Sequence, residues 1–189
     1  MAVTLDATLG GPTSNSYIPM DAAVAIAENI PGGGDWIIAD EELRNLSLIQ
    51  ATRWLETLDY RGDRCTATQR LKWPRNGAEC DGVTSDCTGI PYPIQEAEVA
   101  LAIKYNENPN SFPGAGGGNT APTGTYVKRQ KLDVLEIEYD EFNNTESSSC
   151  DTCGDPSIIQ SFPWLRDLLS CWVTGIATGD NKMIRLFRN

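Results

Sequence analysis

The chain has 189 residues, 40% hydrophobic and 22% charged, which is typical of a globular protein with one ordinary domain. It contains no histidine, which removes the commonest general base, the usual metal ligand and the Ser-His and Cys-His nucleophile pairs. The formal net charge of −11 argues against nucleic acid as a partner, because a polyanion would be repelled. We therefore expect neither an enzyme nor a DNA-binding protein.

The sequence also predicts no membrane segment and no bound cofactor. No apolar run approaches the length of a membrane span, and the first residues lack the basic flank and apolar stretch of a secretory signal. We therefore expect synthesis and assembly in a cytoplasm, where free thiols are the default state of cysteine. The six cysteines are Cys65, Cys80, Cys87, Cys150, Cys153 and Cys171.

Two cysteine pairs have short spacings. Cys150 and Cys153 have zinc-knuckle or redox spacing, but a four-cysteine zinc site would need Cys80 and Cys87 to converge on them, and that second spacing is wide. We predict no metal site. A disulfide between Cys80 and Cys87 remains open.

Residues 1–16 are predicted to form an extended N-terminal arm. A short helix is expected after Pro19, and the run Pro31-Gly32-Gly33-Gly34 then forms a loop. The strongest helix is predicted over residues 40–58, with Asp40 as its cap and apolar residues on one broad arc.

One apolar residue of this helix lies on its polar side. Ile49 is placed beside Arg53 and Glu56. A lone apolar residue on a surface is normal, and a subunit contact has the same pattern. Both interpretations stay open.

The stretch "ATQRLKWPR" (67–75) predicts a short helix with Thr66 or Thr68 as its cap. It is expected to end at Trp73, because a proline disfavours the helical conformation of the residue before it. Residues 76–92 are predicted to be a loop. Pro93 is well placed to open the next helix, "PIQEAEVALAIKYN", whose apolar residues surround most of its circumference.

Residues 106–124 are rich in turn formers and predict a loop. The alternation in 125–142 predicts a β-hairpin, and a last helix is expected over 162–174. Residues 176–189 form a C-terminal tail in which three cations alternate with four large apolar residues, whereas residues 1–181 alone sum to −14. These tail residues are Lys182, Met183, Ile184, Arg185, Leu186, Phe187 and Arg188.

Five segments in this order, "NSY", "LIQATRWLETLDYRG", "QRLKWPRNG", "IPYPIQEAEVALA" and "FPWLRDLL", resemble the tailed-bacteriophage head-to-tail adaptors, also called connector or head-completion proteins. Many sequences of this kind carry the label of a DnaT-like single-stranded DNA-binding protein. The resemblance covers most of residues 15–175, and the two Cys-bearing loops depart from it.

The resemblance implies a structural virion protein at the head-tail junction. The expected fold is mainly α, a compact helical bundle of about four to five helices over residues 17–175, with a small β-hairpin and extended terminal arms. It would form a homo-oligomeric, commonly dodecameric ring that joins the portal protein to the next tail or neck protein. Genomic DNA would pass through without specific binding, and the tail residues 182–188 would dock on the portal.

The runner-up function is single-stranded DNA binding in phage replication, and a small redox or zinc protein is third. Within the motif "QRLKWPR", we expect Gln69, Trp73, Pro74 and Arg75 to form a buried structural corner rather than a base-binding site. Arg75 is expected to hold backbone carbonyls or a carboxylate such as Asp59, because its guanidinium forks into fixed pairs of donors.

Overall fold

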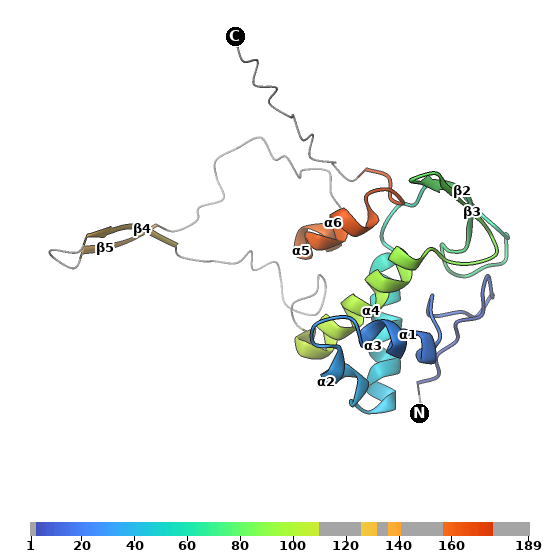
Figure 1. Ribbon diagram of the computed structural model, residues 1–189, viewed down its shortest axis with the longest axis horizontal. Coiled ribbons are helices and arrows are strands. Elements are labelled where there is room, and N and C mark those ends of the chain that lie inside the picture. Colours follow the sequence, from blue (N-terminus) through green and yellow to red (C-terminus); the bar gives the residue numbers. More distant parts are fainter. Residues whose placement is uncertain (1–2, 110–125, 132–135, 141–156, 176–189) are drawn as a thin grey trace, which may run out of the picture.

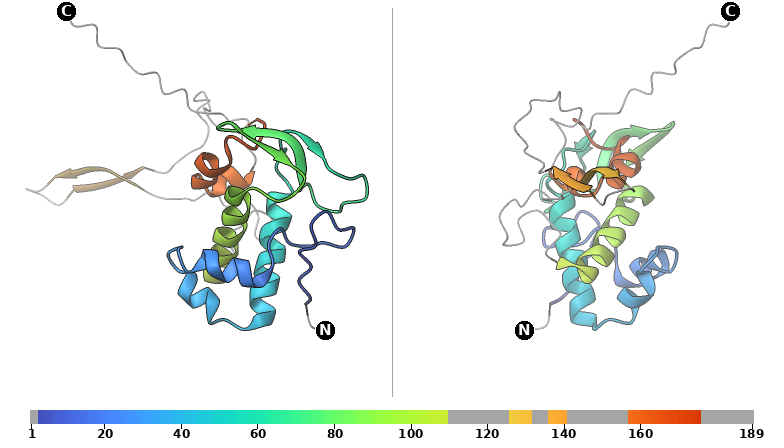
Figure 2. Two further views of the ribbon diagram at one scale, coloured as in Figure 1. Left: turned by 45° about the vertical axis from the view of Figure 1, so that its right-hand side comes forward. Right: turned by 90° about the vertical axis from the view of Figure 1, so that its left-hand side faces the viewer.

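The computed structural model describes residues 3–109, 126–131, 136–140 and 157–175 (Figure 1). Its centre is a pair of long helices, α3 (Glu41–Leu55) and α4 (Tyr92–Glu107), which run antiparallel side by side (Figures 1 and 2). Leu48 and Leu55 of α3 and Ile94 and Leu101 of α4 are fully buried in one hydrophobic core. Both helices lie where the sequence predicts them.

The start of α3 differs in one detail from the prediction. Asp40 occupies the cap position, but its side chain makes no capping hydrogen bond, and only its backbone carbonyl accepts from Arg44. Glu41 and Glu42 in the first turn complement the positive end of the helix dipole.

Two shorter helices, α1 (Met20–Ala27) and α2 (Gly33–Ile37), pack beside the end of the pair where α3 begins (Figure 2). The glycine run is therefore not the simple loop that the sequence predicts. Gly32 adopts a left-handed φ of 85°, and a Cβ on Gly33 would lie 1.9 Å from the carbonyl oxygen of Ala27. Glycines here allow α2 to pack directly against the end of α1.

A three-stranded antiparallel sheet, in the order β1 (Asp63–Arg64), β2 (Arg75–Cys80) and β3 (Val83–Asp86), lies at the opposite end of the helix pair (Figure 1). The prediction of a loop over 76–92 is wrong. Asp81 and Gly82 join β2 to β3 with φ of 49° and 79°. Positive φ at both central residues of a two-residue hairpin favours an Asp-Gly sequence, so this turn fixes the register.

Two strands, β4 (Tyr126–Lys131) and β5 (Glu136–Asp140), pair antiparallel within the range where the sequence predicts a hairpin. The helix predicted over 162–174 is shorter, α6 (Trp164–Leu169), and a second short helix, α5 (Ser157–Ser161), precedes it, with Pro163 between them. Among the described residues, no helix combines the length and the apolar character that crossing a membrane requires.

Two disulfides join distant parts of this fold. Cys65 is bonded to Cys87, and Cys80 to Cys171. The default of free thiols and the open Cys80–Cys87 pairing are both wrong. Cys150 and Cys153 lie outside the described residues.

The expected fold class is also wrong: the protein is mixed α/β with disulfides, rather than a helical bundle with one hairpin. The three-stranded sheet and the two covalent links hold the segment between α3 and α4, which a helical bundle would leave as a plain connection.

Candidate functional site

The segment between α3 and α4 begins with the motif that the sequence singles out. Thr66 and Gln69 exchange reciprocal hydrogen bonds, with the Thr66 amide donating to Gln69 Oε1 (2.9 Å) and the Gln69 amide to Thr66 Oγ1 (3.2 Å). This is the geometry of a helix capping box. No helix follows it, and Gln69 Nε2 donates to the carbonyls of Leu71 (2.9 Å) and Pro74 (3.0 Å). The predicted helix ending at Trp73 is therefore wrong.

Trp73 and Pro74 are buried, and the peptide bond between them is cis. The Trp73 ring is 1% exposed and packs edge-on against Tyr60 (5.6 Å between centroids) and Trp172 (5.8 Å). The Trp73 ring thus contacts Tyr60, which precedes β1, and Trp172, which follows α6. No base stacks on a ring placed in this way.

Arg75 donates to three backbone carbonyls. Its Nε reaches the Arg61 oxygen (2.7 Å), Nη1 reaches that of Lys72 (3.3 Å) and Nη2 that of Gly62. The carboxylate of Asp59 is held by Lys72 Nζ instead, at 3.4 Å. The structure thus gives Arg75 the carbonyl partners that the sequence analysis considered.

A second arginine closes the same turn. Arg64 Nη2 donates to the carbonyls of Gln69 (2.9 Å), Arg70 (3.0 Å) and Leu71 (3.1 Å). Arg64 lies directly across the β1–β2 ladder from Arg75. Like charges at opposite positions of a sheet repel each other, so this pairing costs stability.

Six cations lie in the segment that runs from the end of α3 to the start of β2. We call them the cationic corner: Arg53, Arg61, Arg64, Arg70, Lys72 and Arg75. Residues 53–75 contain these six and three acids, for a net charge of 6 − 3 = +3, so the rest of the chain carries −11 − 3 = −14. In this segment the cations therefore outnumber the acids, although the chain as a whole is acidic.

Carboxylates neutralise little of this charge. In the part of the chain that the structure describes, the two salt bridges are Lys72–Asp59 and Lys104–Glu107. Among the described residues, the exposed side chains of Arg53 and Arg70 donate only to Gln50 Oε1 and to the Thr13 carbonyl, respectively, each at 3.3 Å. A guanidinium has five donors, so most of theirs have no acceptor among the residues that the structure describes.

Arg53 and Arg70 line one hollow of about 190 Å³, together with Ile49 and Glu56. The three residues that the sequence offers for a subunit contact, Ile49, Arg53 and Glu56, are therefore brought together beside Arg70. Glu56 Oε1 accepts from the backbone amide of Lys72 (2.7 Å) and from the Tyr17 hydroxyl, so its carboxylate anchors the corner to the N-terminal segment.

A buried carboxylate on α4 holds the same N-terminal segment. Glu98 is 0% exposed and accepts from Ser16 Oγ (2.7 Å), Thr52 Oγ1 (2.8 Å) and the Tyr17 amide (3.1 Å). Burial raises the pKa of Glu98 to about 8, against the opposing effect of these hydrogen bonds.

The sequence alone gave Glu98 no predicted role. The polar triplet "NSY" is the one sequence feature that could have pointed to a buried acid, because a buried carboxylate needs hydrogen-bond donors nearby. The three groups that bind Glu98 come from "NSY" and from α3, so the acid joins the N-terminal segment to both central helices.

A family model described as "Putative DnaT-like ssDNA binding protein" matches residues 1–189. The chain belongs to this family. No curated protein and no solved structure matches the chain.

The family match corrects the resemblance to head-to-tail adaptors. The family is described as one that binds single-stranded DNA, and nothing found supports a ring adaptor or portal and tail partners. The virion role and the statement that DNA is not bound are therefore wrong. The proposed portal-docking residues 182–188 lie outside the described residues.

Proposed function

We propose that this protein binds single-stranded DNA through the cationic corner, without catalysis. The observation that supports this most is the set of arginines whose hydrogen bonds go to carbonyls and amides rather than to carboxylates. Their positive charge remains available to phosphates. The family description points to the same partner.

The way these arginines are held suits phosphate binding. Arg64 and Arg75 are fixed by three carbonyls each, so they lose little conformational entropy when a strand binds. Each phosphate contact releases condensed counterions, which supplies affinity without reading the bases.

The aromatic rings of the corner contribute to its framework. Tyr17, Tyr60 and Trp73 are buried. Stacking on such rings would need the core to open, so we expect binding that depends on backbone charge and is largely independent of sequence. This fits an acidic protein that contacts a strand over a short basic surface.

Fluorescence anisotropy with a labelled oligothymidylate tests the proposal. Wild-type protein should bind at low salt, and an unlabelled single strand of a different sequence should compete as well as unlabelled oligothymidylate. Replacing Arg53, Arg61 and Arg70 with glutamine should weaken binding by about tenfold or more at low salt. No anisotropy change for the wild type at low salt would contradict the proposal.

A further inference from the structure

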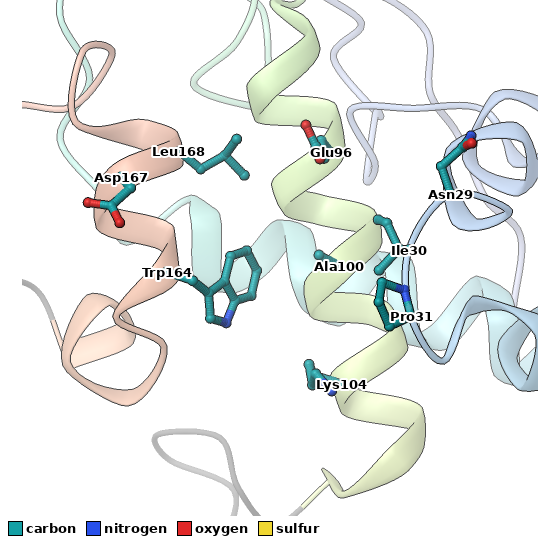
Figure 3. A pocket seen from close by; sticks show the side chains of 9 residues that line it. All are labelled: Asn29, Ile30, Pro31, Glu96, Ala100, Lys104, Trp164, Asp167 and Leu168. Carbon is teal, nitrogen blue, oxygen red and sulfur yellow. The ribbon is translucent and has the colours of Figure 1, made fainter.

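A second concave surface, separate from the cationic corner, lies beside α4. It is a groove of about 800 Å³ between α4 and α6, bordered by the loop after α1 (Figure 3). Ile30, Ala100, Trp164 and Leu168 give it apolar walls. In Figure 3 the Trp164 ring reaches from α6 toward α4.

The polar groups of this groove are mainly acidic. Glu96 on α4 and Asp167 on α6 line it, and within the described residues neither carboxylate has a cation or a hydrogen-bond donor. The one lysine of the lining, Lys104, is already paired with Glu107 at 2.7 Å. The groove therefore fits a segment that is both apolar and basic, and it repels a nucleic acid.

A segment of this kind lies at the C-terminal end of the sequence. In "KMIRLFRN" (182–189), Lys182, Arg185 and Arg188 recur at every third position, with two apolar residues after each of the first two. Four large apolar side chains can cover the apolar walls, while the cations meet Glu96 and Asp167. Both the apolar and the charged chemistry of the segment complement the groove.

The tether to this segment favours the same molecule over a second copy. The described chain reaches Gly175 directly after α6, which is itself one wall of the groove, and Val173 is still hydrogen-bonded to Leu169. Seven residues lead from Gly175 to Lys182, a reach of at most about 24 Å. Such a short tether gives an effective concentration in the millimolar range.

We propose that residues 182–189 dock in the α4–α6 groove of their own molecule. The docked segment covers Trp164 and neutralises Glu96 and Asp167, so that the exposed positive charge of the protein is concentrated at the cationic corner. This inference does not depend on DNA binding.

Limited trypsin digestion of the full-length protein, without DNA, tests the docking. Trypsin cleaves after Lys182 and Arg185, and intact-mass spectrometry follows the removal of the last residues. Glu96→Gln with Asp167→Asn should speed this cleavage roughly fivefold, the effect expected of two partly exposed ion pairs. Asp21→Asn with Glu42→Gln, an equal charge change on exposed acids away from the groove, should leave the rate unchanged.

A second variant tests the apolar part without a change of charge. Ala100→Trp fills the groove and should speed cleavage similarly, provided that its circular-dichroism melting curve shows a folded protein. Equal cleavage rates for wild type and both groove variants would overturn the proposal. Protection that grows with protein concentration would also overturn it, because it would show docking into a second copy.

Discussion

A partner is proposed for two surfaces, the cationic corner and the α4–α6 groove. They differ in the volume of their cavities and in the sign of their charge. The groove is the larger, about 800 Å³ against about 190 Å³, and has an exposed face of Trp164. Its carboxylates nevertheless exclude a phosphate backbone, whereas the smaller hollow holds Arg53 and Arg70. The sign of the charge, rather than the size of the cavity, assigns DNA to the corner.

The two surfaces are covalently joined. The Cys80–Cys171 disulfide connects the last residue of β2, the strand that begins with Arg75 of the corner, to the residue two positions beyond the end of α6. Replacing both cysteines with serine should lower the free energy of unfolding by about 4–5 kcal/mol, because the bond closes a long loop in the unfolded chain. Urea denaturation under non-reducing conditions measures it.

The shorter loop of Cys65–Cys87 provides the comparison. Its sequence separation is 22 residues against 91, so Cys65→Ser with Cys87→Ser should cost less, about 3 kcal/mol. If both double variants are as stable as the wild type, these disulfides do not hold the fold.

The tryptophans near the two surfaces, Trp73 and Trp164, differ in how deeply they are buried. Trp73→Ala should destabilise the protein by about 3–5 kcal/mol, because it empties the space between Tyr60 and Trp172. Trp164 is half-buried at the groove, so Trp164→Ala should cost less, about 1–2 kcal/mol. Thermal and urea unfolding of both variants measure the difference, and equal destabilisation would remove the distinction between a core ring and a groove ring.

Two glutamates on α4 extend the comparison to pH. The folded-state pKa of Glu98, about 8, lies above its ordinary value of 4.5, so the folded protein binds this proton more tightly than the unfolded chain. Stability from this group is therefore present at low pH and lost as pH rises through 8. Between pH 5 and 8, the wild type should lose up to about 1.4 kcal/mol per pH unit relative to Glu98→Gln.

Glu96→Gln is the matched control, since Glu96 lies on the same helix but lines the groove. Its stability should follow the wild type across the same pH range in urea titrations. A flat difference between wild type and Glu98→Gln would show that Glu98 stays charged in the folded protein.

Local sequence patterns predicted the two central helices well. The apolar arc of 40–58 and Pro93 located α3 and α4 to within a few residues. The β2–β3 hairpin was missed although Asp81-Gly82 is a strong turn signal, because Cys80 and Val83 were not considered as strand residues. The disulfide pairings are inaccessible from one sequence, since six cysteines allow many connectivities.

The candidate site was missed for a different reason. All six cations of the corner are visible in the sequence, but the net charge of the whole chain was used to exclude DNA. Proteins present charge locally, and a field decays within about one Debye length of roughly 10 Å. Only the folded structure shows that Arg64 and Arg70 lie together and that carbonyls, not carboxylates, take their hydrogen bonds.

The salt dependence of oligothymidylate binding tests the central claim most directly. Wild-type protein is compared with Arg53→Gln/Arg61→Gln/Arg70→Gln and with Arg44→Gln/Lys104→Gln/Arg166→Gln, which removes as many cations from α3, α4 and α6. If the corner binds phosphates, its variant should reduce the magnitude of the negative slope of log K against log salt by about 2, or roughly 0.7 for each phosphate that is no longer neutralised. The other variant should keep the wild-type slope. Equal slopes for the two variants would contradict a DNA site at the cationic corner.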